Sequence, residues 1–276
     1  MRVVIRSIFS LKLVLILAGF SDQVFAEEAW PRITIITSLF KGENYIAQFL
    51  ADITRQSVFS QCELIILNAN PPGQGWEETI IRKYLQKYPK HIVYRRLPQD
   101  PGLYEVWNRG IKMARGRFIT NANVDDRLAP DCYETHAHFL DAFPEVDLVY
   151  SDSYITRIPN ETFELNSHLG LIHHPEFSPK AILKANLPSF NPMWRKSLHQ
   201  KYGYFDNSFK IVADWEMWVR MITKGAIFRK VSGIHGLFYY NTGGVSLSKS
   251  SYDLQMQERE RVKALYPDFF KTEEKL

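Results

Sequence analysis

Two adjacent carboxylates follow an apolar segment of the chain, and their position suggests a metal site. Phe118 and Ile119 lead to Asn123, Asp125 and Asp126. Neighbouring carboxylates repel each other unless a positive charge lies beside them. Mg²⁺ and Mn²⁺ prefer oxygen ligands and join carboxylates to the phosphates of a ligand. The motif therefore predicts a divalent metal held by Asp125 and Asp126, with Asn123 on the ligand. The alternative is that Asp126 caps the turn or helix that follows.

A third carboxylate, Asp214, stands where an amphipathic helix is expected to begin. Trp215 and Trp218 flank it, and apolar neighbours of this kind raise the pKa of a carboxyl group. A carboxylate in that environment suits a general base that removes a proton from an acceptor hydroxyl. Two alternatives stay open: Asp214 caps the helix, or Glu216 is the base. The two acids are too close in sequence to face the same way on a helix.

The segment that begins at Pro101 and Gly102 has the features of an anion-binding helix start. Gly102 allows a ligand to approach the backbone closely, and the free N–H groups of a helix N-terminus attract anions. Asn108 and Arg109 are polar in an otherwise apolar helix, although Arg109 could simply face solvent. We assign Gly102, Tyr104, Asn108 and Arg109 to the binding of a phosphate-bearing donor.

Apolar runs alternate with segments of helical periodicity, which indicates βαβ units and a mainly parallel sheet flanked by helices. Ligands of such sheets bind at the carboxyl ends of the strands. Polar residues follow the expected strands there, so we also assign Thr37, Ser38, Asn68, Asn70 and Asn123 to donor binding. The expected strands are 32–39, 63–67, 92–96, 117–120, 148–150, 228–231 and 238–240. The expected helices are 42–56, 76–88, 103–115, 131–142, one within 206–224, and 252–266, whereas 156–192 is expected to be mostly loop.

The order of these blocks resembles family 2 of the inverting glycosyltransferases, which have the GT-A fold. The resemblance extends over residues 32–245 and rests on the stretches 33–45, 62–70, 101–126 and 193–220. It implies a single-domain α/β GT-A fold and a nucleotide-sugar donor. It also implies a divalent metal, Mn²⁺ or Mg²⁺, and direct displacement with inversion at the sugar. The acceptor would be a glycan, a lipid or a protein.

The resemblance also assigns roles to individual residues. Asp125 corresponds to the metal-binding Asp of the family, and Asp214 to its catalytic base. Asn68 to Asn70 correspond to the turn that holds the nucleobase, and Ser38 lies in the loop beside that turn.

The chain departs from the family pattern at positions that usually carry an acid. Asn123, the Asn68–Asn70 turn and Ala213 each stand where the family has a carboxylate. An alternative is therefore a glycan-binding or nucleotide-sugar-binding protein that has lost turnover. No Gln-x-x-Arg-Trp block or membrane span follows the domain, which favours single addition over processive synthesis.

Composition excludes several other classes of protein. The chain has 276 residues, 34 basic and 30 acidic side chains, a net charge of +4 and two cysteines. Its basic residues are scattered, which argues against nucleic acid as a partner. Cys62 and Cys132 are expected to be buried free thiols. A dinucleotide-dependent oxidoreductase is disfavoured because no Gly-x-Gly-x-x-Gly follows the first expected strand.

The N-terminus resembles a secretory signal. A basic start precedes the apolar run Leu13 to Phe20, and Ala26 ends a small-residue cleavage pattern. We expect residues 1–26 to be a signal peptide or a membrane anchor. The folded part would then lie in the secretory pathway, the periplasm or outside the cell, or be anchored to a membrane. The expected divisions are a glycosyltransferase domain over 32–250, with a nucleotide-sugar half (32–127) and an acceptor half (128–250), and a helical tail over 251–276.

Overall fold

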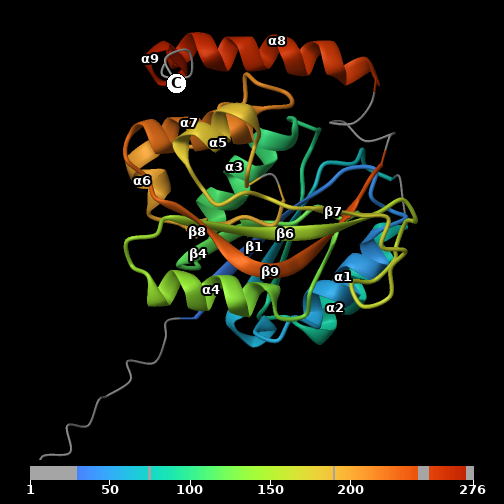
Figure 1. The fold of residues 1–276 in the computed structure, drawn as a ribbon. Coiled ribbons are helices and arrows are strands. Elements are labelled where there is room, and N and C mark those ends of the chain that lie inside the picture. Colours follow the sequence, from blue (N-terminus) through green and yellow to red (C-terminus); the bar gives the residue numbers. More distant parts are fainter. Residues whose placement is uncertain (1–29, 74–75, 189, 242–248, 272–276) are drawn as a thin grey trace, which may run out of the picture.

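A mixed sheet of nine strands forms the centre of the computed structural model, which describes residues 30–73, 76–188, 190–241 and 249–271 (Figure 1). The strand order is β3-β2-β1-β4-β8-β6-β9-β5, and β7 pairs with β6. The strands are β1 (Ile33–Leu39), β2 (Cys62–Asn68), β3 (Ile92–Arg96), β4 (Phe118–Asn121), β5 (Arg127–Leu128), β6 (Leu148–Thr156), β7 (Gly170–Ile172), β8 (Met193–Arg195) and β9 (Phe228–Tyr239). The helices are α1 (Ile46–Thr54), α2 (Glu77–Lys87), α3 (Leu103–Met113), α4 (Cys132–Ala142), α5 (Pro179–Lys184), α6 (Leu198–Tyr202), α7 (Ala213–Thr223), α8 (Lys249–Leu265) and α9 (Pro267–Lys271).

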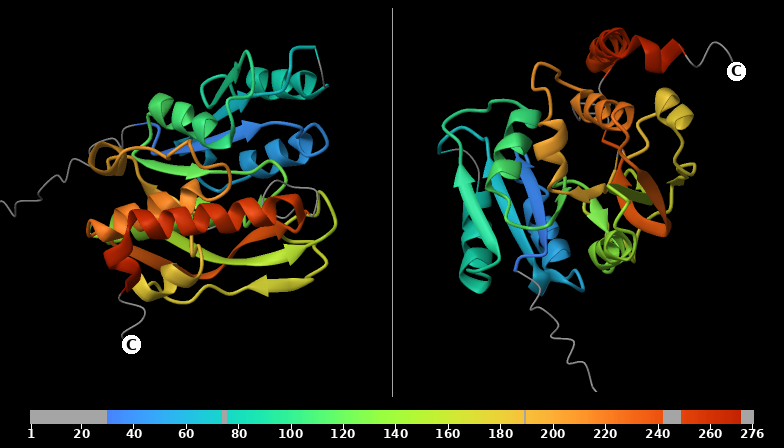
Figure 2. Two further views of the ribbon diagram at one scale, coloured as in Figure 1. Left: turned by 90° about the horizontal axis from the view of Figure 1, so that it is seen from above. Right: turned by 90° about the vertical axis from the view of Figure 1, so that its left-hand side faces the viewer.

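The first half of the chain confirms the predicted parallel units. β1 lies between β2 and β4, with Ile35 opposite Leu64 on one side and Thr120 on the other. Helices α1 and α2 pack on the face that carries Ile35, and α3 packs on the face that carries Ile36 (Figure 2). A Cβ atom at Gly110 of α3 would lie 2.4 Å from Ile36, so this glycine lets the helix approach the sheet. Burial on both faces explains the continuous apolar character of β1 and β2.

The second half is antiparallel in part, and here the sequence prediction was less accurate. β8 runs antiparallel to both β4 and β6, and neither β8 nor α6 was predicted. The expected loop over 156–192 contains β7 and α5. The two strands expected over 228–231 and 238–240 are one strand, β9. Gly233 has φ of +106°, a value that favours glycine, and it lies at a local irregularity within β9. From the sequence, this irregularity was interpreted as the end of one strand and the start of another.

The C-terminal helix lies against the domain. Figures 1 and 2 show α8 crossing over α7, and its Val262 is fully buried in the same hydrophobic cluster as Trp215. Cys62 and Cys132 are buried free thiols, as predicted. In the part of the chain that the structure describes, no helix has the length and apolar character that a membrane crossing needs.

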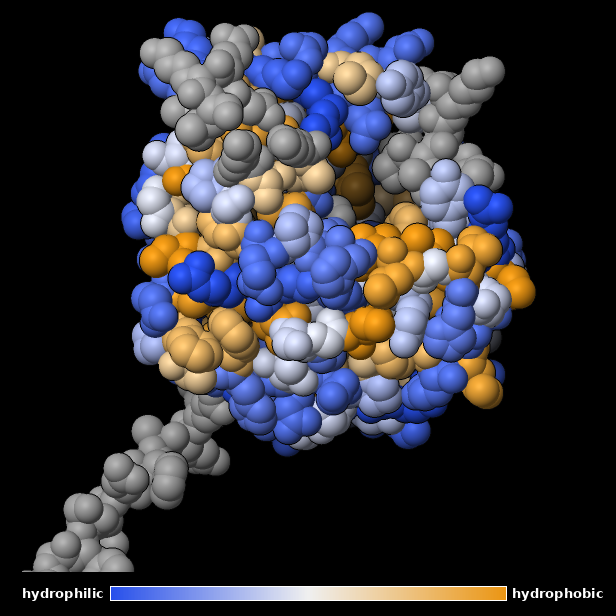
Figure 3. All heavy atoms as spheres, in the orientation of Figure 1, coloured by the Kyte–Doolittle hydropathy of each residue, from blue (hydrophilic) through white to orange (hydrophobic). Residues whose placement is uncertain are grey.

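The surface around β7 carries exposed apolar side chains. Figure 3 shows apolar residues gathered on the side where Figure 1 places β7, and a hollow in the surface just below α8. The exposed large side chains of the segment around β7 are Ile158, Leu165, Leu169 and Leu171.

Candidate active site

Asp126 of the acidic motif is held by hydrogen bonds on both carboxylate oxygens. The motif lies in the loop between β4 and β5. One oxygen accepts the backbone N–H of Tyr239 (2.9 Å), and the other accepts the side-chain amide of Asn123 (3.0 Å). Burial, and then the charge of Asp125, hold the pKa of Asp126 well above its usual range. Asp126 thus joins the motif to β9, and it is not the cap of a following helix.

Asp125 is the more accessible carboxylate of the pair. It is half-buried and accepts a hydrogen bond from Asn241, while burial raises its pKa. A cation does lie beside the two acids: the guanidinium of Arg127 is buried under the motif and donates to the carbonyl groups of Val124 and Asp126. Arg127 therefore offsets part of the repulsion that the sequence pattern implied.

The donor set fits a metal that is bound together with its substrate. Among the described residues, no cluster of three or more His, Cys, Asp or Glu side chains surrounds one point. Mg²⁺ and similar ions are commonly held by one or two carboxylates, with waters and substrate phosphates as the other ligands. The half-buried carboxylate of Asp125 would be the protein ligand of such a site, because the oxygens of Asp126 are engaged by Tyr239 and Asn123.

The turn after β2 is built from side-chain amides around a buried acid. The side-chain amide nitrogens of Asn68 and Asn70 both donate to the same carboxylate oxygen of Glu77, each at 3.3 Å. The amide oxygen of Asn70 accepts the backbone N–H of Lys41 (2.8 Å), which fixes the loop after β1. Glu77 is fully buried, and its other oxygen has no hydrogen-bond partner among the described residues. This turn therefore contains a carboxylate that comes from α2.

Thr37 and Ser38 lie at the carboxyl end of β1, beside that turn. Ser38 is half-buried and faces Leu67 of β2 in the sheet register. Thr37 is fully buried, and its hydroxyl has no partner within the described part of the chain.

At the start of α3, where the sequence predicts an anion site, the polar side chains contact other parts of the protein. Gly102 has φ of +90° and precedes the first helical residue. Asn108 makes two hydrogen bonds to the backbone of Phe205, as donor to its carbonyl (2.8 Å) and as acceptor of its N–H (3.0 Å). Arg109 forms an ion pair with Glu105 one helical turn away (2.9 Å). Asn108 thus connects the two halves of the chain, and Arg109 lies on the helix surface.

Asp214 occupies the first turn of α7 and is held from two sides. Asn186 donates to one carboxylate oxygen (2.6 Å), and the hydroxyl of Tyr104 donates to the other (3.2 Å). Val212 occupies the N-cap position, so Asp214 is not the cap. Burial raises the pKa of Asp214, whereas hydrogen bonds from Trp215, Asn186 and Tyr104 lower it. The residue is half-buried, and both of its carboxylate oxygens are oriented by hydrogen bonds, as a general base requires.

Glu216, the competing base, has a structural role. It is 3 % exposed, forms a two-pronged ion pair with Arg220 (both contacts 2.9 Å), and accepts the hydroxyl of Tyr266 (2.5 Å). Its oxygens are therefore occupied by the protein.

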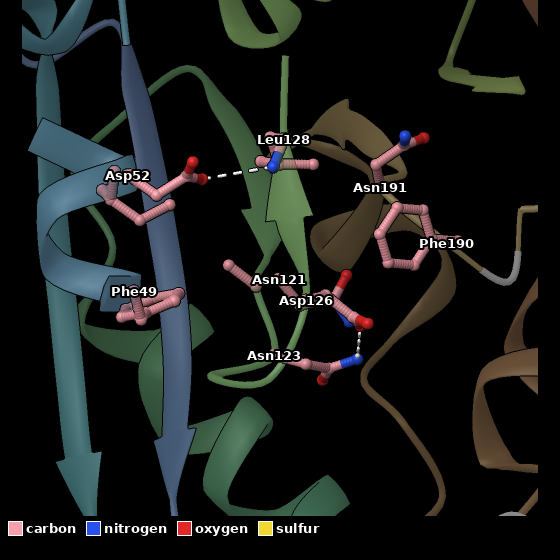
Figure 4. Close-up of a pocket in the computed structure, with 10 residues that line it drawn as sticks. Phe49, Asp52, Asn121, Asn123, Asp126, Leu128, Phe190 and Asn191 are labelled. Atoms are coloured by element: carbon pink, nitrogen blue, oxygen red, sulfur yellow. Dashed lines mark hydrogen bonds between the residues drawn. The ribbon is translucent and has the colours of Figure 1, made fainter. Parts of the chain in front are cut away.

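A small pocket lies behind the acidic motif, between α1 and the segment that leads into β8 (Figure 4). Its amides are unusual: Asn121 Oδ1 and Asn191 Nδ2 are buried without a partner among the described residues. Asp52 accepts the backbone N–H of Leu128 (3.1 Å), and burial raises its pKa to about 6. Unpartnered buried amides cost free energy, so the pocket is suited to water or a small polar group. Its apolar walls are Phe49, Ile53, Leu128 and Phe190.

Several residues of the site region had no sequence signal. Arg127, Asn186 and Tyr239 contact the motif residues from positions that no local pattern singles out. Glu77 could have been noted, because it begins a helix directly after the turn that it contacts.

The family profile described as "Glycosyl transferase family 2" matches residues 34–207. Among curated proteins, the chain is 31% identical over 118 residues to the minor teichoic acid biosynthesis protein GgaB of Bacillus subtilis (strain 168), covering 42% of this chain and 13% of GgaB. It is 24% identical over 221 residues to a PGL/p-HBAD biosynthesis glycosyltransferase of Mycobacterium bovis (strain BCG / Pasteur 1173P2), covering 79% of this chain and 80% of that protein. The chain thus spans only a small part of GgaB.

Solved structures show the same fold. S. aureus TarS 1-349 in complex with UDP-GlcNAc superposes with a TM-score of 0.62 and 15% identity, over 81% of this chain and 64% of that one. The mannosyltransferase PcManGT from Pyrobaculum calidifontis, in complex with GDP-Man and Mn²⁺, superposes with a TM-score of 0.57 and 14% identity. This match covers 79% of this chain and 59% of that one. The α/β fold with a mixed sheet is therefore the fold of these glycosyltransferases, as predicted.

Proposed function

The chain belongs to glycosyl transferase family 2, and from this premise we propose that it transfers one sugar at a time from a nucleotide-sugar donor to an acceptor hydroxyl, with inversion and with help from a divalent metal. The glycosyltransferase class itself follows from the family. The inversion, the metal and the single addition are the proposed part.

In the proposed reaction, Asp214 accepts the proton of the acceptor hydroxyl while the acceptor oxygen forms a bond to the anomeric carbon. The bond from that carbon to the diphosphate breaks, and the nucleoside diphosphate leaves with the electron pair. Attack from the side opposite the leaving group inverts the configuration. A divalent metal bound at Asp125 would supply positive charge to the leaving diphosphate.

The observation that carries the proposal is the setting of Asp214. Tyr104 and Asn186 hold its two oxygens, the residue is half-buried, and burial raises the pKa of its carboxyl group, which favours acceptance of a proton. The competing candidate base, Glu216, is less suited, because its oxygens are engaged by Arg220 and Tyr266.

Release of nucleoside diphosphate from a panel of UDP-sugars and GDP-sugars, with and without Mn²⁺, tests the proposal. UDP-GlcNAc and GDP-Man are the first donors to try because related folds bind them. We expect Asp214→Asn to lower turnover by at least about 100-fold while UDP or GDP affinity stays within about threefold of wild type. Asp253→Asn, on the exposed side of α8, is the matched control. Nucleotide binding without turnover of any donor would support the alternative, a binding protein.

We also propose that residues 1–26 direct export or anchor the chain, on the basis of their basic start and apolar run. These residues lie outside the described part of the structure. Mass spectrometry of the mature N-terminus after expression in the native cell tests this. An intact Met1 in a soluble cytoplasmic fraction would contradict it.

A further inference from the structure

Glu258 of α8 binds the backbone that leads into the helix of Asp214. Its carboxylate oxygens accept three successive backbone N–H groups, those of Lys210 (2.6 Å), Ile211 (2.9 Å) and Val212 (3.1 Å). Glu258 is 6 % exposed, so these are buried, charge-assisted hydrogen bonds, which are stronger than neutral ones. Val212 is the N-cap residue of α7, and Asp214 follows in its first turn.

The same backbone is connected to Asp214 by a second route. The carbonyl of Ile211 accepts the hydroxyl of Tyr104 (2.5 Å), and that hydroxyl also donates to the carboxylate of Asp214 (3.2 Å). The position of Ile211 therefore affects both the start of α7 and the donor that orients Asp214. Glu258 fixes this peptide unit from its other side, because it accepts the N–H of Val212, which belongs to the same peptide unit as the carbonyl of Ile211.

Helix α8 is itself well fixed on α7. Val262 is fully buried, and the guanidinium of Arg259 lies 4.3 Å from the ring centre of Trp215. Beyond α8, the hydroxyl of Tyr266 donates to Glu216 of α7. The carboxylate of Glu258 therefore comes from an anchored element, which limits how far the loop it binds can move.

We propose that Glu258 is a positioning residue for the catalytic base: it holds residues 210–212, and through them Asp214 and Tyr104, in the geometry that proton removal needs. This inference rests on the proposed function, since it takes Asp214 as the base. It makes α8 a part of the catalytic half of the enzyme. Misplacement of a reacting group by about 1 Å can cost on the order of 100-fold in rate.

The test compares Glu258→Ala and Glu258→Gln with Glu260→Ala, a neighbouring acid on α8 that is exposed and contacts Lys263. We expect Glu258→Ala to lower kcat by about 10-fold to 100-fold, with UDP or GDP affinity within about twofold of wild type. Hydrogen exchange of peptides that contain residues 210–212 should increase. Glu258→Gln keeps the size of the side chain but replaces one acceptor oxygen by a donor, so an intermediate loss of kcat is expected even if the Ala variant folds poorly. Glu260→Ala should match wild type.

Unchanged kcat in a folded Glu258 variant would overturn the inference, and so would a loss of nucleotide affinity as large as the loss of kcat. Asp214→Asn separates this failure from that of the proposed function. If Asp214→Asn abolishes turnover but the Glu258 variants turn over at the wild-type rate, only the positioning role is wrong. If Asp214→Asn keeps full turnover, both are wrong.

Discussion

Asp52 carries a charge that the fold disfavours, and replacing it should stabilise the protein in a pH-dependent way. The side chain is 3 % exposed behind the acidic motif, where it accepts the N–H of Leu128. Burial raises its pKa from 3.8 to about 6, against the opposing effects of this hydrogen bond and of Arg127. The folded protein therefore holds a proton in a range where the unfolded chain has released it.

The size and sign of the effect follow from linkage. Well below pH 3.8 the carboxyl is protonated in both states, and its contribution to stability is fully present. Stability is lost as the pH rises from 3.8 to the folded pKa of about 6, and above that range the loss is constant. A difference of about two pKa units corresponds to about 3 kcal/mol at pH 7. Asn at this position is uncharged and keeps an oxygen that can accept the N–H of Leu128.

Urea unfolding of wild type and Asp52→Asn between pH 4 and pH 8 measures this effect. We expect equal free energies of unfolding near pH 4 and an advantage of up to about 3 kcal/mol for the variant at pH 7. Asp268→Asn is the matched control, because the side chain of Asp268 is 99% exposed, and it should change the free energy by less than about 0.5 kcal/mol. A variant less stable than wild type at pH 7 would refute the reasoning, since attraction between Asp52 and Arg127 would then outweigh burial.

Two further predictions concern the motif and the sheet around it. Asp125→Ala should abolish Mn²⁺-dependent binding of UDP or GDP in calorimetry. Asn123→Ala should only weaken this binding, because Asn123 would act on the metal through its contact with Asp126. Equal effects of the two substitutions would mean that the motif has been misinterpreted. Gly236→Ala should lower the free energy of unfolding by about 1–3 kcal/mol, because a Cβ atom there would lie 2.0 Å from Phe190 and 2.6 Å from Ser153. Gly170→Ala, whose Cβ would meet Ile155 at an ordinary 3.5 Å, is the control for this second variant, and equal melting temperatures would contradict the prediction.

The parallel half of the fold could be predicted because its information is local. β1 and β2 are buried on both faces, so their apolar runs are continuous, and each is followed by a helix with a clear period. The other half lacks this regularity. β8 has only three residues between loops, and β9 contains a glycine at positive φ, so the pairing partner rather than the local sequence decides that these segments are strands.

The sequence singled out polar residues whose contacts it could not predict. Asn108 and Arg109 were assigned to the donor, yet the first binds the backbone of Phe205 and the second forms an ion pair with Glu105. Both are polar residues in an apolar helix, and the sequence cannot tell a polar group that binds a ligand from one that satisfies a distant backbone. Glu258 shows the same limit, since it contacts residues 46 to 48 positions away in the chain.

The amides in the turn after β2 surround a carboxylate that comes from another element. Asn68 and Asn70 both donate to Glu77, which is fully buried at the start of α2. A carboxylate at position 68 or 70 would place a second negative charge against this buried acid, and like charges at hydrogen-bond distance strongly disfavour joint ionisation. Amides at positions 68 and 70 avoid that repulsion and donate to Glu77 instead, and Arg96 lies 3.7 Å from the same oxygen of Glu77. The turn after β2 therefore contains a carboxylate that comes from α2 and not from the turn itself.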